Sequence, residues 1–192
     1  TWVRRGDVGP DPGYMDFTAT SNNYIYALDD DGEVSVSTDG GISWTRLGDI
    51  GAGGDYQAIV ADGNDYLYVI RQNGRTYRST DGGNTWTYMG DAGGLTYMSL
   101  ITDSNNYIYT IATDGRFYRS TNGGATWTLR GDVGAFNDLV DIAVDTNNYF
   151  YALRSNGRVY RSIDGGVSWS YRGDAGPQTF VSISFDSGNN LY

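Results

Sequence analysis

The chain has 192 residues, enough for one domain with a sizeable core, and it is rich in Gly and aromatic residues but lacks Lys and has a single glutamate, Glu33. This composition argues against helices, and the net charge of −10 excludes the basic surface that nucleic acids or anionic membranes require. Because Cys and His are absent, thiol chemistry is excluded and no metal site or cofactor is expected. No apolar run of the length of a membrane span is present.

Tryptophan recurs at a nearly constant spacing, at positions 2, 44, 86, 127 and 169. A fixed period of about 42 residues with strand-like content is typical of propellers and related arrays. We therefore expect a single domain over residues 1–192, with repeats at about 3–44, 45–86, 87–127 and 128–169.

The second repeat serves as the template for the strands. Residues 45–47 continue a strand begun at Trp44, residues 57–61 and 66–70 read as two further strands, and the Asn73–Gly74 hairpin turn leads into a strand at 75–79. A loop then turns the chain into the next strand at Trp86. Four antiparallel strands in each repeat predict an all-β fold, a β-propeller of four-stranded blades.

The phase of the repeats predicts how the ring closes. The chain starts within a fourth strand and ends with a first strand and the start of a second. We expect residues 170–192 to combine with residues 1–2 in a composite, incomplete fifth blade. An open half-blade exposes a sheet edge, so we also expect self-association or fibre formation through this blade.

An octad ends each full repeat, at residues 37–44, 79–86, 120–127 and 162–169. Its Asp can accept backbone N–H groups within the loop, its glycines permit unusual backbone angles, and its Trp covers the loop. The third octad has Asn in place of Asp, which indicates that an acceptor is needed there and a charge is not. The structural residues of the octads would be Ser37, Asp39, Gly41, Trp44, Ser79, Asp81, Gly83, Trp86, Ser120, Asn122, Gly124, Trp127, Ser162, Asp164, Gly166 and Trp169.

The pattern Ser-x-Asp-x-Gly-x-Ser/Thr-Trp resembles the Asp-box, or BNR repeat, of sialidases, sortilin-type receptors and photosystem assembly factors. The resemblance covers essentially the whole chain. It implies a propeller in which the octad is a folding element on the blade periphery, away from the usual ligand face.

No catalytic set is evident. Sialidase chemistry in this family needs an arginine triad and a Tyr–Glu pair. The arginines here recur at two fixed positions in the third strands of the later repeats, as Arg75, Arg116 and Arg158 and as Arg78, Arg119 and Arg161, which suits pairing between blades and stacking on Tyr. The run 29–33 looks like a calcium loop but occupies a hairpin turn, so we expect a solvated turn and no metal.

The segments that differ most between repeats join each fourth strand to the next first strand. In a propeller they lie on one face with the turns between second and third strands, and variation gathered on one face suggests a presenting surface. The expected ligand contacts are Tyr14, Asp55, Tyr56, Tyr97, Phe136 and Asn137.

The function that these observations favour is a non-enzymatic recognition or structural module that binds a glycan or a protein, either extracellular or on a cell or virion surface. Two alternatives remain open at this point. One is a self-assembling structural subunit or designed repeat protein, and the other is a fragment of a sialidase-like glycoside hydrolase.

Overall fold

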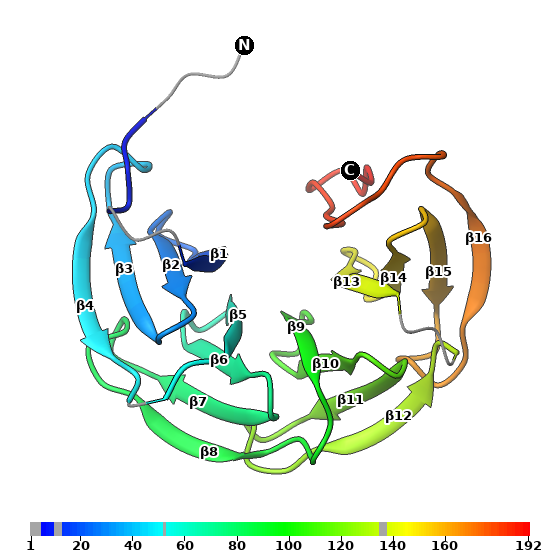
Figure 1. Cartoon of the computed structure of the whole chain (residues 1–192), viewed down its shortest axis with the longest axis horizontal. Helices are drawn as coiled ribbons and strands as arrows, with labels where there is room; N and C mark the ends of the chain where they lie inside the picture. Colours follow the sequence, from blue (N-terminus) through cyan, green and yellow to red (C-terminus); the bar gives the residue numbers. More distant parts are fainter. Residues whose placement is uncertain (1–4, 10–12, 52, 135–137) are drawn as a thin grey trace.

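A computed structural model describes residues 5–9, 13–51, 53–134 and 138–192. Its strands form four separate antiparallel sheets of four strands each. The sheets stand as blades along an open arc with one strand of each blade nearest the centre (Figure 1). The predicted all-β propeller of four-stranded blades is confirmed, and the described residues contain no helix that could cross a membrane.

Each blade runs in chain order from its innermost to its outermost strand. Blade 1 consists of β1 (Tyr14–Ala19), β2 (Ile25–Asp29), β3 (Glu33–Ser37) and β4 (Thr45–Asp49). Blade 2 consists of β5 (Tyr56–Ala61), β6 (Leu67–Arg71), β7 (Arg75–Ser79) and β8 (Thr87–Asp91). Blade 3 consists of β9 (Tyr97–Thr102), β10 (Ile108–Ala112), β11 (Arg116–Ser120) and β12 (Thr128–Asp132). Blade 4 consists of β13 (Leu139–Val144), β14 (Phe150–Arg154), β15 (Arg158–Ser162) and β16 (Ser170–Asp174).

The fourth strands begin after the octad tryptophans, not at them. Side-chain bonds within the octad extend to Thr85, so the ladder with β7 starts only at Thr87. Blades therefore end about five residues later than the predicted repeats, and residues 170–174 belong to blade 4 as β16. The composite fifth blade stays a prediction, since residues 1–2 lie outside the described part of the chain.

The hydrophobic core lies between blades. One cluster combines Tyr26, Leu28 and Val34 of blade 1 with Tyr56 and Leu67 of blade 2. The second strands of the middle blades, β6 and β10, are buried along their whole length, because a neighbouring blade covers each face of the sheet. Apolar residues on both faces of these strands are what such double burial requires.

Each octad folds into the same hydrogen-bonded loop. In the second octad, the hydroxyl of Ser79 accepts the Gly83 N–H at 2.8 Å and donates to Asp81, whose other oxygen accepts the Thr85 hydroxyl at 2.6 Å. These donors hold the pKa of the exposed Asp81 carboxyl at about 2, with the Thr85 hydroxyl as the largest cause. Asn122 makes the matching contacts to Ser120 and Thr126, so an uncharged acceptor suffices, as predicted.

The octad also joins neighbouring blades, a role that the sequence did not predict. A Cβ added to Gly83 would lie 2.9 Å from Leu47 of blade 1, one on Gly124 would lie 2.6 Å from Thr76 of blade 2, and one on Gly166 would lie 2.2 Å from Phe117 of blade 3. The second glycine of the second, third and fourth octads is thus pressed against the preceding blade. Its lack of a side chain sets the distance between the two sheets.

Turns between the first and second strands form a second link between blades. Asp65, Asn106, Asn148 and Asn189 all have positive φ and occupy the same turn position. Each accepts a backbone N–H from the corresponding turn of the preceding blade, for example Gly63 N–H to Asn106 at 2.8 Å and Thr146 N–H to Asn189 at 2.9 Å. Short polar side chains tolerate this backbone conformation, which explains the Asn and Asp at these positions.

Two neighbouring octad glycines should respond differently to substitution by Ala. Gly165→Ala introduces only backbone strain, since its φ is +74° and the nearest group is the flexible end of Arg130 at 3.4 Å. This should cost about 1–2 kcal/mol in the free energy of unfolding. Gly166→Ala adds a clash with Phe117 and should cost a further 1–3 kcal/mol, roughly the cost of overpacking a core. Urea denaturation of both variants measures the difference, and equal losses would contradict the contact between blades.

Candidate functional site

The predicted ligand contacts differ in their exposure to solvent, and two of them lie outside the described residues. Asp55 is exposed, with φ of 73°, in the segment between blades 1 and 2, where its carbonyl accepts the Gln72 N–H at 2.7 Å. Tyr14 is half-buried at the start of β1. Phe136 and Asn137 lie outside the described residues. The bond from Gln72 confirms that these segments share a face with the turns between second and third strands.

Tyr56 and Tyr97 require a correction, because both are fully buried. The Tyr56 ring lies against Gly32 in the hairpin turn of blade 1, and the Tyr97 ring lies against Gly74 in the equivalent turn of blade 2. The Tyr97 hydroxyl donates to the Ala92 carbonyl at 2.8 Å. These rings fill the junctions beneath the loop face and are removed from the set of ligand contacts.

The arginines of the third strands are distributed over separate blades. Arg78, Arg119 and Arg161 each lie over a Tyr ring of their own blade, at 5.3–5.9 Å from the ring centre. This confirms the predicted stacking of Arg on Tyr, but the pairing is within blades and not between them. Each of these guanidinium groups is thus engaged by a Tyr of its own blade.

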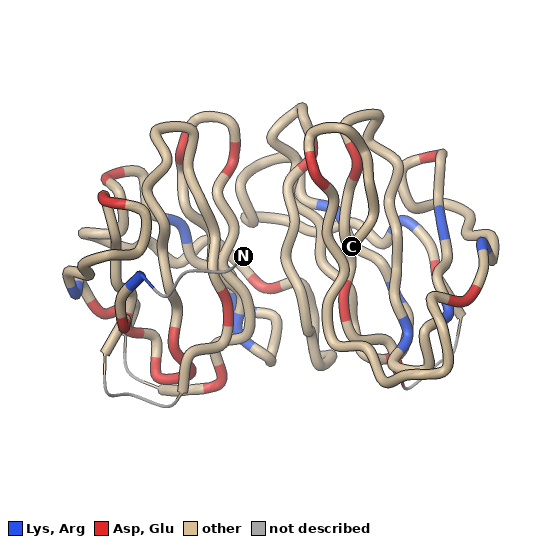
Figure 2. The backbone as a smooth tube through the Cα atoms, turned by 90° about the horizontal axis from the view of Figure 1, so that it is seen from above, with Lys and Arg blue, Asp and Glu red and all other residues tan. Residues whose placement is uncertain are grey.

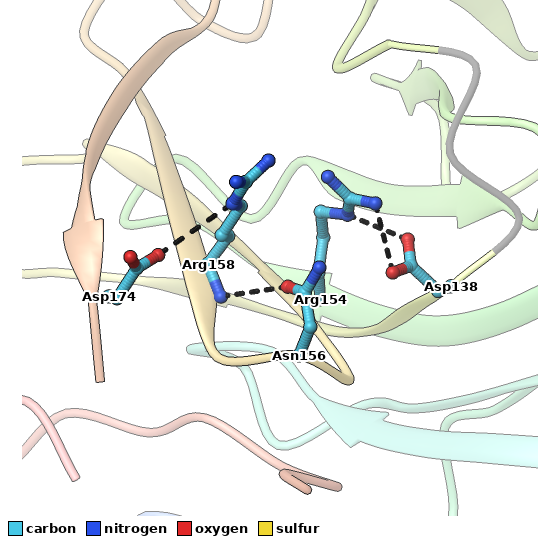
Figure 3. A network of polar contacts seen from close by, with 5 residues as sticks. All are labelled: Asp138, Arg154, Asn156, Arg158 and Asp174. Atoms are coloured by element: carbon cyan, nitrogen blue, oxygen red, sulfur yellow. Dashed lines mark hydrogen bonds and ion pairs between the residues drawn. The ribbon is translucent and has the colours of Figure 1, made fainter. Parts of the chain in front are cut away.

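The loop face of blade 4 carries a fixed ionic network (Figure 3). Arg154 donates two hydrogen bonds to Asp138, at 2.6 and 2.9 Å. The Arg158 Nε lies 3.8 Å from a carboxylate oxygen of Asp174. The Arg158 backbone N–H donates to the Asn156 side-chain oxygen at 3.1 Å. A shallow depression of about 460 Å³ borders Asn156, Arg158 and Asp174.

A polar cavity of about 250 Å³ lies where the innermost strands meet. We call it the axial cavity. Blades 1 to 4 each contribute to it through β1, β5, β9 and β13, which surround the centre of the arc in Figure 1. Its lining residues are Met15, Asp16, Gln57, Ala58, Met98, Ser99, Val140, Asp141, Val181 and Ser182. The third residue of each innermost strand faces this cavity, so two carboxylates, Asp16 and Asp141, enter it from opposite ends of the arc.

Asp141 is saturated by the protein. One of its oxygens accepts the Ser99 hydroxyl and the N–H of the next residue, Ile142, both at 2.8 Å. Its second oxygen accepts the Ser182 hydroxyl at 3.1 Å and the Ile183 N–H at 3.0 Å. A carboxylate has about four acceptor positions, so this set occupies them all. Asp141 therefore links blade 3, blade 4 and the C-terminal segment through hydrogen bonds.

Asp16 receives fewer donors than Asp141 from the described residues. Two backbone groups of that part of the chain reach it, the Phe17 N–H at 2.8 Å and the Ile59 N–H at 2.9 Å. Burial raises the pKa of the Asp16 carboxyl from 3.8 to about 6, the two N–H donors oppose this rise, and the nearby Asp141 charge adds to it. A partly buried anion with unused acceptor positions gains from a ligand that brings positive charge or N–H donors.

No group of three or more acidic residues suited to a metal ion occurs in the described residues. The acidic run 29–33 forms a hairpin turn. In it Asp29 is buried and accepts the Glu33 N–H at 2.8 Å, while Glu33 pairs with Arg46. These internal bonds are those of a hairpin turn, in which Asp29 is buried and not solvated.

Sequence reasoning missed Asp16 and Asp141. The signal lies in the alignment of the repeats, where the third position of the innermost strands and its equivalent near the C-terminus read Asp16, Ala58, Ser99, Asp141 and Ser182. Apolar residues flank both acidic positions, Asp16 and Asp141. An acidic residue in an otherwise apolar strand is worth attention because an unpaired buried charge is costly.

Comparison with known proteins identifies relatives at the level of family and fold. A family model described as the DUF6242 beta propeller domain matches residues 18–136, well over half of the chain. A search of curated proteins gave no match.

Solved structures with the same fold have low sequence identity. YCF48 bound to D1 peptide is 16% identical, with a TM-score of 0.72 over 93% of this chain and 59% of its own. A catalytically inactive virginiamycin B lyase from Staphylococcus aureus with quinupristin is also 16% identical, with a TM-score of 0.76 over 95% and 64%. A nidogen/laminin complex is 14% identical, with a TM-score of 0.75 over 93% and 70%. The chain thus spans about three fifths of the length of YCF48, and these similarities show a shared fold.

The raised pKa of Asp16 should appear in the pH dependence of stability. Its folded-state pKa of about 6 exceeds its unfolded-state value near 4, so the native state binds more protons in this window. The contribution of Asp16 is fully present below about pH 4 and is lost as the pH rises through about 6. Asp16→Asn should remove this decline.

Thermal unfolding at intervals from pH 4 to pH 7.5 would measure the effect. Asp114→Asn is the matched control, because Asp114 lies in a hairpin turn and its contact with the Arg116 N–H can be kept by Asn. A Tm profile of Asp16→Asn with the same slope as wild type would contradict the assignment.

Proposed function

Since this chain belongs to the DUF6242 beta propeller domain family, we propose that it is a non-enzymatic module that recognises a polypeptide through a basic group held at Asp16 in the axial cavity. The single observation that carries this proposal is the difference between the two axial carboxylates. The described residues supply four donors to Asp141, which fill its acceptor positions, but only two to Asp16.

Overall charge supports a cationic partner. The chain carries a net charge of −10, and its acidic residues lie along turns at both edges of the arc (Figure 2). Such a field attracts positively charged ligands and speeds their encounter. A Lys or Arg side chain that enters the cavity would meet Asp16 in a space that Gln57 and Ser99 also line.

The shared fold with YCF48 gives further support. The solved YCF48 structure holds a peptide, which demonstrates that a propeller of this shape can present a peptide-binding surface. The identity of 16% transfers no individual contact, so the proposal for this chain rests on the axial cavity itself.

A glycoside hydrolase is disfavoured by the same geometry. Such enzymes need two carboxyl groups that are available to the substrate, one as acid and one as base or nucleophile. Asp141 is engaged by four protein donors that also hold two blades and the C-terminal segment together. Its use as a nucleophile or base would require breaking these hydrogen bonds.

Selection from a random peptide display library tests peptide recognition. Peptides selected by the wild-type protein should carry Lys or Arg at one fixed position and should bind Asp16→Asn about tenfold or more weakly, since a charge-assisted hydrogen bond is lost. Binding should also weaken when the pH falls from 7.5 to 5, because protonation neutralises Asp16. Asp114→Asn should bind as wild type. Selected peptides without a basic residue, or with equal affinity for Asp16→Asn, would overturn the proposal.

We propose glycan binding as a second candidate, supported by tyrosines on the outer strands. Tyr88 and Tyr171 are each 51% exposed and meet Tyr77 and Tyr160 edge to face, so each can present one ring face to a sugar ring. Blade 3 has Leu129 in this position and provides an internal comparison. A glycan array probed with wild type and with Tyr88→Ala/Tyr171→Ala tests it. No bound glycan, or a bound glycan unaffected by the double substitution, would exclude this surface.

A further inference from the structure

Bulges precede the third residue of each innermost strand. In β1, β5, β9 and β13 the pairing register with the second strand shifts between the first and the third residue, for example between Tyr56 and Ala58 in β5. A β-bulge redirects the side chain beside it. Because the same irregularity recurs in all four blades, the residues at the third position can be compared with one another as equivalents around the axial cavity.

The two axial carboxylates bind the following inner segment in the same way through one oxygen. The Oδ2 atom of Asp141 accepts the Ile183 N–H at 3.0 Å, and the Oδ2 atom of Asp16 accepts the Ile59 N–H at 2.9 Å. Ile183 and Ile59 occupy the same repeat position. The residue that precedes each isoleucine therefore lies beside the equivalent carboxylate oxygen.

This preceding residue differs between the two carboxylates. At Asp141 it is Ser182, whose hydroxyl donates to Oδ2 at 3.1 Å as a second donor beside the backbone N–H. At Asp16 it is Ala58, which has a methyl group and no donor. The described residues thus supply one donor to Oδ2 of Asp16, the Ile59 N–H, although a carboxylate oxygen can accept two.

The place of Ala58 is fixed by the strand around it. Ala58 is 2% exposed, pairs with Ile70 in the ladder between β5 and β6, and belongs to the same core cluster as Tyr68. It also lines the axial cavity together with Asp16. The acceptor position that residue 58 does not fill is therefore held beside the cavity by rigid structure, where a donor from a ligand can reach it.

We propose that Ala58 is a specificity-determining residue of the axial cavity, an inference that rests on the peptide recognition proposed above. The methyl group of Ala58 leaves one acceptor position on Oδ2 of Asp16 to the ligand. An ammonium or guanidinium N–H of the ligand takes the place there that the Ser182 hydroxyl takes on Asp141. A serine at position 58 would fill this position from within the protein, and Asp16 would then join blades as Asp141 does.

One added oxygen atom tests this geometry without a ligand. Ala58→Ser supplies a hydroxyl that donates to the ionised form of Asp16, so it should lower the pKa of the Asp16 carboxyl from about 6 toward its ordinary value. A ¹³C NMR titration of the carboxyl groups in the intact protein measures this pKa, and Asp16→Asn identifies the resonance. The variant should fold, because serine is only slightly larger than alanine and its hydroxyl has a partner.

Ala61→Ser is the matched control. It adds the same hydroxyl to β5, at a residue that is not among those lining the axial cavity. The pKa of Asp16 should therefore be the same in this variant as in wild type.

Two end-blocked peptides, Ala-Ala-Lys-Ala-Ala and Ala-Ala-Arg-Ala-Ala, are the probes for binding. In wild type, at least one of them should shift the NMR signals of the Phe17 and Ile59 amides, which donate to Asp16. Ala58→Ser should bind that peptide at least tenfold more weakly, since a hydrogen bond to a charged group is lost. Ala61→Ser should bind it as wild type.

The outcomes separate this inference from the proposal on which it rests. An unchanged pKa of Asp16 in Ala58→Ser, or equal binding of the peptide by Ala58→Ser and wild type, would overturn the role of Ala58 and leave peptide recognition standing. The absence of binding to wild type at millimolar concentrations of both peptides would overturn recognition of a basic group at Asp16, and the inference with it.

Discussion

The close contact between the octad glycine of one blade and the preceding blade governs the rest of this structure. Gly166 lies so near the Phe117 ring that even a methyl group would overlap it. The contact fixes the separation of adjacent sheets, and the core clusters that span two blades depend on that separation. The hydrogen bonds inside the octad keep this turn rigid. The packing between blades therefore depends on the hydrogen bonds within the loop.

Much of the fold could be predicted from the sequence, because the residues that recur in each repeat are needed for hydrogen bonds and backbone angles close by in the chain. The octad Ser, Asp and Trp positions and the glycines of the hairpin turns reflect bonds and backbone angles within a few residues. The third strand at 75–79 was predicted to the residue. Contacts between blades were harder, since nothing in the spacing of Gly82 and Gly83 reveals that one of them meets a side chain 36 residues earlier, at Leu47.

The candidate site was less predictable for a related reason. The segments that vary between repeats do lie on one face with the turns between second and third strands, but the variation did not distinguish a ring that reaches solvent from one that fills a junction. Tyr56 and Tyr97 begin innermost strands and are enclosed by the preceding turn, while Asp16 and Asp141 follow two residues into their own strands and face the axis. Whether a carboxylate is saturated depends on donors from three separate segments, and a linear reading does not contain that information.

The links between turns have a direction. Asn106 accepts from the N–H of Gly63, Asn148 from that of Ser104, and Asn189 from that of Thr146. In each of these bonds the backbone donor belongs to the earlier blade and the side-chain oxygen to the later one, although the Asn148 Nδ2 also donates back to the Ser104 hydroxyl at 2.8 Å. The octad contact has the same sense. The arc of blades is consequently directional. The surface that a blade turns toward the preceding blade, which we call its head, differs chemically from the surface it turns toward the next blade, its tail. Any assembly that extends this interface must join head to tail, and such heterologous contacts build rings or helices and not two-fold dimers.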